Sequence, residues 1–115
     1  MGLIEMKAID NLKEIGAKTG KDLVGVLIEM YRNSVPQSIE SMRNLLESKD
    51  FESLGREAHS LKSSSANLGV SVIREVSKKI EIGILKNELD PEQIKSLILE
   101  IEKDLPQCLD ELTNL

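Results

Sequence analysis

Aliphatic side chains recur every three or four residues along most of the 115-residue chain, and this spacing most limits its possible folds. Residues at that spacing lie on one face of an α-helix, and no stretch alternates apolar with polar residues as a half-buried strand would. Aromatic residues make up only 2% of the chain, so the core must consist of Leu, Ile, Val, Met and Ala. The sequence therefore predicts an all-α protein packed by aliphatic side chains.

Capping residues, glycines and prolines divide this pattern into a short N-terminal helix and four longer helices. The short helix carries Ile9, Leu12 and Ile15 and is expected to end at Gly16, with Thr19 capping the next helix. That second helix should present one apolar face to the core. The residues predicted on this face are Leu23, Leu27, Met30, Ser34, Ser38, Met42 and Leu45.

The remaining boundaries follow from local signals. Pro36 lacks a backbone donor and should kink or interrupt the second helix, and Pro106 should bend the last one. Asp50 is a suitable N-cap for the third helix, and Gly69 is placed to end it. Residues 90–93, Asp-Pro-Glu-Gln, combine a cap, a proline at the first helical position and a glutamine three residues after the cap.

Four longer helices with short connections pack most simply as an antiparallel four-helix bundle, with the short first helix as a lid. No linker, charge block or repeat marks an internal boundary, so residues 1–115 are expected to form a single domain. A closed bundle leaves no obvious apolar patch for self-association, and we expect a monomer.

Composition excludes several classes of function. A net charge of −5 argues against duplex DNA or an anionic membrane as partner, and the lack of aromatics leaves no stacking platform for single-stranded nucleic acid. Cys108 is the one cysteine, so neither an internal disulfide nor a cysteine-based zinc site is expected. We find no two-histidine metal spacing, signal peptide, membrane-length apolar run or convincing nucleotide-binding loop, and expect a cytoplasmic protein without its own cofactor.

One residue carries distinctive chemistry. His59 is the only histidine, and it follows Ala58, which lies on the apolar face of the third predicted helix. At 3.6 residues per turn, its side chain points about 100° away from that face, toward solvent. An imidazole is largely neutral and nucleophilic near neutral pH. His59 is therefore the candidate nucleophile.

The neighbours of His59 on the helix surface suit a group-transfer site. Lys62 and Arg56 are cations within reach of an anionic group attached to the imidazole. Small residues one or two turns away would let another protein approach closely, even though a helical glycine costs about 1 kcal/mol relative to alanine. The residues predicted to dock a partner are Glu52, Gly55, Arg56, Ser63 and Ala66.

The segment from Ala58 to Gly69, Ala-His-Ser-Leu-Lys-Ser-Ser-Ser-Ala-Asn-Leu-Gly, resembles the phosphorylation-site helix of histidine phosphotransfer (HPt) domains. The family pattern is close to Ala-His-x-Leu-Lys-Gly-Ser-x-x-x-Leu-Gly. Ser63 departs from it, because the family most often has glycine there. Elsewhere the resemblance extends over nearly the whole chain as a succession of helices rather than residue by residue.

The resemblance implies that His59 accepts a phosphoryl group and that Lys62 stabilises it. It further implies that the surrounding face docks receiver domains of a hybrid histidine kinase and of a response regulator, with magnesium held by the receiver. The protein would be a phosphotransfer carrier without kinase activity. Two alternatives stay open: a non-catalytic helical adaptor, in which His59 is incidental, and a fragment of a larger kinase.

Overall fold

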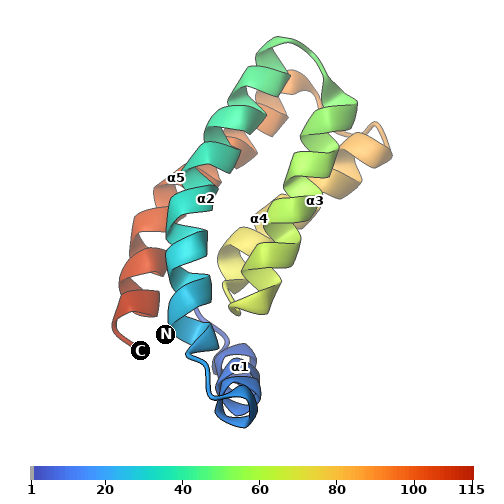
Figure 1. Ribbon diagram of the computed structural model, residues 1–115. Helices are drawn as coiled ribbons and strands as arrows, with labels where there is room; N and C mark the ends of the chain where they lie inside the picture. The colour runs from blue at the N-terminus through green and yellow to red at the C-terminus, as the bar shows by residue number, and fades with distance from the viewer. Residues whose placement is uncertain (1) are drawn as a thin grey trace.

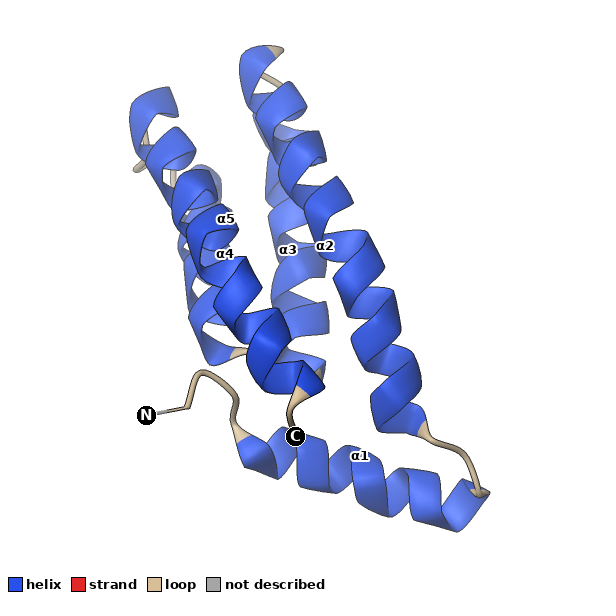
Figure 2. Ribbon diagram, turned by 90° about the vertical axis from the view of Figure 1, so that its left-hand side faces the viewer, coloured by secondary structure: helices blue, strands red, loops and turns tan. Residues whose placement is uncertain are grey.

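The computed structural model describes residues 2–115, and its architecture is all-helical, as predicted (Figure 1). The first helix, α1 (Met6–Thr19), lies across one end of a bundle formed by the other four helices (Figure 2). These are α2 (Leu23–Glu47), α3 (Phe51–Asn67), α4 (Ser71–Leu85) and α5 (Pro91–Thr113). Within residues 2–115 the only extended pairing is an isolated bridge between Ile4 and Val70.

Each helix of the bundle packs against two neighbours. The adjacent pairs are α2 with α3, α3 with α4, α4 with α5, and α5 with α2, so α3 and α5 lie diagonally opposite. Buried aliphatic side chains from all four helices meet in one core, joined by Ile9 of α1. In the core, the Tyr31 hydroxyl of α2 and the Ser65 hydroxyl of α3 form a 2.7 Å hydrogen bond, which satisfies two polar groups that would otherwise be costly to bury.

The boundary between α1 and α2 differs from the prediction. Helix α1 continues past Gly16 to Thr19 and ends at Gly20, which has a left-handed φ of 72°. Gly16 is needed for a close approach instead, because a Cβ there would lie 2.5 Å from the Lys21 carbonyl oxygen. The predicted cap was also wrong: Asp22 caps α2 by accepting from the Gly25 amide at 3.0 Å.

The face of α2 that enters the core is also not the predicted one. Met42 is buried as expected, but Met30 is 59% exposed. The N-terminal half of α2 is apolar on more than one face, so periodicity alone could not choose between them. Packing against α1 and α3 selects the face. The buried residues are Ile28, Tyr31, Val35, Ile39 and Met42.

Neither internal proline interrupts its helix. Helix α2 continues through Pro36, with Val35 and Ile39 both buried on its core face, and α5 continues through Pro106. Tertiary packing of the apolar face offsets the loss of one backbone hydrogen bond. The other predicted signals are confirmed: Asp50 caps α3, Gly69 follows its end with a φ of 69°, and the capping box at the start of α5 is formed.

Two remaining points are the state of the single cysteine and the apolar length of the helices. The Cys108 thiol is free and buried, as expected for a small apolar residue on a helix face. No helix within residues 2–115 is long and apolar enough to cross a membrane.

Candidate functional site

The core face of α3 fixes the direction of His59. Leu54, Ala58 and Leu61 are buried and hold α3 against its neighbours. Because His59 follows Ala58, its side chain projects from the flank of the bundle and is 58% exposed. The predicted exposure of the imidazole is therefore confirmed.

A glutamate from the neighbouring helix meets the imidazole. The Oε2 atom of Glu81, on α4, forms a hydrogen bond with Nδ1 of His59. Its other oxygen, Oε1, accepts a 2.6 Å hydrogen bond from Lys62 Nζ. Thus His59, Lys62 and Glu81 form one cluster across the interface between α3 and α4, with the glutamate in the middle.

The electrostatics of this cluster determine which ring nitrogen carries hydrogen. The hydrogen bond from Lys62 is the main cause that lowers the pKa of Glu81 below its ordinary value, and the bond with His59 lowers it further. Glu81 is therefore ionised at neutral pH, and an ionised carboxylate can only accept hydrogen bonds. Nδ1 of His59 must carry the hydrogen. In the neutral ring this leaves the lone pair on Nε2, which has no hydrogen-bond partner among residues 2–115.

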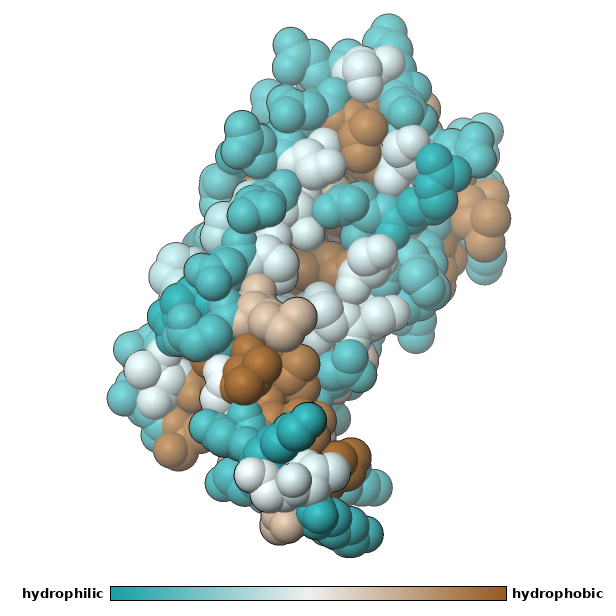
Figure 3. All heavy atoms as spheres, in the orientation of Figure 1, coloured by the Kyte–Doolittle hydropathy of each residue, from teal (hydrophilic) through white to brown (hydrophobic). Residues whose placement is uncertain are grey.

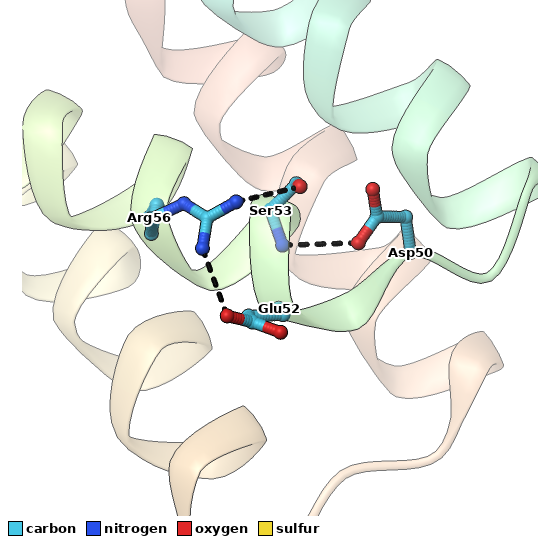
Figure 4. A network of polar contacts seen from close by, with 4 residues as sticks. All are labelled: Asp50, Glu52, Ser53 and Arg56. Atoms are coloured by element: carbon cyan, nitrogen blue, oxygen red, sulfur yellow. Dashed lines mark hydrogen bonds and ion pairs between the residues drawn. The ribbon is translucent and has the colours of Figure 1, made fainter.

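No hydrogen bond joins Arg56 to His59 among residues 2–115, and the predicted reach of Arg56 toward a group attached to the imidazole stays a prediction. Figure 4 shows Arg56 turned toward Glu52 and Ser53. Its guanidinium donates to Glu52 Oε1 and to Ser53 Oγ, both at 3.0 Å, toward the N-terminal end of α3. A carboxylate four residues earlier on the helix is within reach of the guanidinium and carries the opposite charge. The Arg56 and Glu52 side chains are 67% and 85% exposed, so their ion pair adds little stability.

The remaining predicted docking residues lie one or two turns from His59 on α3 and form no hydrogen bond with it within residues 2–115. Ser63 and Ala66 are exposed on α3, one and two turns beyond His59. Gly55 lies one turn before it and is half-buried, because this position faces α4. A Cβ at Gly55 would lie 3.6 Å from Cγ2 of Ile84, which is an ordinary contact distance.

The Gly55→Ala variant is therefore expected to be more stable than the wild type, by up to about 1 kcal/mol, because alanine has the better helix propensity and its methyl group fits. Urea unfolding followed by circular dichroism would measure this change. Gly69→Ala is the matched control and should destabilise, since its Cβ would lie 2.4 Å from the Glu5 carbonyl oxygen at a left-handed φ. A destabilised Gly55→Ala variant would contradict the expectation.

Glu81 was missed in the sequence analysis. The available signal was that Glu81 directly follows the core residue Ile80, as His59 follows Ala58, so each lies on the flank of its own helix. That signal becomes informative only once α3 and α4 are known to be adjacent and their relative register is known. No group of three or more metal-ligating side chains occurs in the part of the chain that the structure describes.

The chain is similar to a known domain family and to a curated relative. The sequence pattern of the Hpt domain family matches residues 26–115, which contain the whole of α3, α4 and α5 and most of α2. A curated relative, "Phosphorelay intermediate protein rdeA" of Dictyostelium discoideum, is 29% identical over 94 residues. The aligned region is 82% of this chain but 36% of that relative, so the chain spans little more than a third of its length. No solved structure matched the chain.

Proposed function

Because the Hpt pattern matches most of its sequence, this chain belongs to the Hpt domain family, and we propose that it is a phosphotransfer intermediate of two-component signalling. In this proposal His59 accepts a phosphoryl group from a receiver-domain aspartate of a hybrid histidine kinase and passes it to the receiver domain of a response regulator. The relative named as a phosphorelay intermediate supports the same role.

The observation that carries the proposal is the pairing of an exposed imidazole with Glu81. The carboxylate holds hydrogen on Nδ1, so the nucleophilic lone pair belongs to Nε2 on a ring that a partner can reach. A lone surface histidine without a partner would exchange between its two neutral tautomers. The cluster therefore supports a reaction at Nε2.

Nε2 of His59 attacks the phosphorus of the receiver's aspartyl phosphate in line, the bond from phosphorus to the aspartate oxygen breaks, and the aspartate leaves as a carboxylate. The ring then carries hydrogen on Nδ1 and phosphorus on Nε2, so it is formally cationic. Glu81 accepts a hydrogen bond from Nδ1 in both states, and its negative charge stabilises the cationic ring more than the neutral ring. Magnesium on the receiver offsets phosphoryl charge.

The protein's own contribution is a positioned nucleophile rather than a complete active site. The same chemistry run in reverse phosphorylates the second receiver, so we propose a carrier without kinase activity of its own. The cytoplasmic location predicted from the sequence remains part of this proposal.

A labelling experiment tests the proposal. The chain is incubated, with magnesium, with each receiver domain of the same genome after phosphorylation by acetyl phosphate. We expect phosphate to appear on the chain in an acid-labile, base-stable linkage, as for a phosphoramidate, and to map to His59 by mass spectrometry. A chain that binds receivers without acquiring phosphate would support the adaptor alternative and contradict the proposal.

Lys62 is proposed to stabilise the phosphoryl group, and its present partner is Glu81. We expect Lys62→Ala to lower the rate constant for transfer to His59 by about 10-fold, because one charge-assisted hydrogen bond contributes about 1.5 kcal/mol. Stopped-flow or rapid-quench transfer from the receiver measures this rate. The exposed Lys79→Ala variant on α4 is a control for loss of a positive charge. Equal rates for Lys62→Ala and the wild type would remove Lys62 from the mechanism.

A further inference from the structure

The most exposed large apolar side chain in the described residues lies close to the candidate site. Leu85, the last residue of α4, is 82% exposed. It follows Glu81 by four residues, so it lies on the same face of α4, about 6 Å further along the helix axis. Figure 3 shows apolar surface standing out at the right-hand edge of the molecule, over the C-terminal end of α4.

The absence of a side chain at Gly55 extends this apolar surface toward α3. Ile84, the residue before Leu85, lies beside Gly55, where an added Cβ would be 3.6 Å from its Cγ2 atom. Ile84 is half-buried, and no side chain of residue 55 covers it. We call Gly55, Ile84 and Leu85 the apolar ledge. Gly55 is one helical turn from His59, so the ledge adjoins the imidazole.

A protein interface is wide enough that any partner that reacts with His59 also covers the apolar ledge. A specific interface covers about 800 Å² of each partner, which corresponds to a disc of about 16 Å radius. Transfer requires the donor's phosphorus to come within bonding distance of Nε2, so the disc is centred near His59. Glu81 contacts the imidazole, and Leu85 is only one turn beyond Glu81. Leu85 therefore lies within the covered area.

We propose that the apolar ledge binds an apolar side chain of the receiver domain next to its phosphorylated aspartate. This inference rests on the proposed phosphotransfer function. The free protein holds Leu85 in water, and the partner removes it from water, so burial favours the complex. Because the ledge does not contact the reacting atoms, it sets the affinity for the receiver rather than the rate of the chemical step.

The test compares truncations of two exposed leucines. The probe is the acetyl-phosphate-treated receiver domain that labels the wild-type chain fastest. For Leu85→Ala we expect the half-saturating receiver concentration in single-turnover transfer to rise about tenfold, or about 1.4 kcal/mol, while the maximal rate constant stays within twofold. Leu99→Ala is the matched control, because Leu99 is 46% exposed on α5, the helix diagonally opposite α3. It should behave as the wild type.

Leu85→Asp, which places a charge on the ledge, should weaken binding more than the alanine variant. Both variants should keep the wild-type circular dichroism and urea midpoint, since an 82% exposed side chain contributes little to the core. If Leu85→Ala had the wild-type half-saturating receiver concentration and His59 were still labelled, the proposal that the apolar ledge binds the receiver would be wrong. The proposed phosphotransfer function would stand. A chain that no receiver labels would overturn both proposals together.

Discussion

Replacing His59 with glutamine should abolish transfer of phosphate to the chain. A glutamine amide nitrogen is not nucleophilic, because its lone pair is delocalised into the carbonyl, so no bond to phosphorus can form. The side chain is 58% exposed, and its loss removes no core contact. We therefore expect no acid-labile phosphate on His59→Gln after incubation with a phosphorylated receiver, together with an unchanged far-ultraviolet circular dichroism spectrum.

Ser60→Gln is the matched control for this experiment. Ser60 is the next residue on α3 and is also exposed, so the variant places the same amide beside an intact His59. It should label at close to the wild-type level. If His59→Gln retained acid-labile, base-stable phosphate, the phosphoryl acceptor would lie elsewhere and the assignment of His59 would be wrong.

The second large effect is expected at Glu81. Glu81→Ala should slow transfer to His59 about 10- to 100-fold, by analogy with the loss of a carboxylate that orients a metal-bound imidazole. Without the carboxylate, the neutral ring divides between its two tautomers, and the cationic phosphorylated ring loses its anionic partner. Single-turnover transfer from a saturating phosphorylated receiver measures the rate, and nitrogen-15 NMR of the imidazole reports which ring nitrogen carries hydrogen.

A glutamine at position 81 separates the two roles of the carboxylate. Its amide oxygen can still accept from Nδ1, but it carries no charge. Glu81→Gln should keep the Nδ1–H tautomer in the NMR spectrum, and any remaining loss of rate then measures the electrostatic contribution. Wild-type transfer and an unchanged tautomer in Glu81→Ala would show that Glu81 only pairs with Lys62.

The number and type of helices followed from local signals. Asp50 and the Asp90–Gln93 capping box mark helix starts through hydrogen bonds that close within three residues, and Gly69 marks an end through its own backbone conformation. Such features depend on neighbours in sequence, so they can be read from it. The predicted helix end at Gly16 and cap at Thr19 were wrong. Gly16 instead allows the Lys21 carbonyl to approach it closely after the chain has turned back, and this contact is not local.

The site was recoverable from the sequence only in part. His59 and Lys62 lie three residues apart on one helix, so the spacing already placed them together. The side-chain direction of Arg56 was not recoverable, because a flexible guanidinium chooses among several partners, and here it bonds Glu52 and Ser53. Leu85 gave no signal at all, since an exposed leucine at a helix end differs from a core leucine only in the folded protein.

By itself the sequence determined an all-helical chain with a nucleophilic imidazole on the outer flank of its third helix. Helical period and capping are local properties, and one buried face is enough to orient the residue beside it. Only the tertiary structure decided that Glu81 meets His59 and which face of α2 is buried. Both depend on which helices are neighbours and on their relative axial positions. The packing of the whole core sets these two properties.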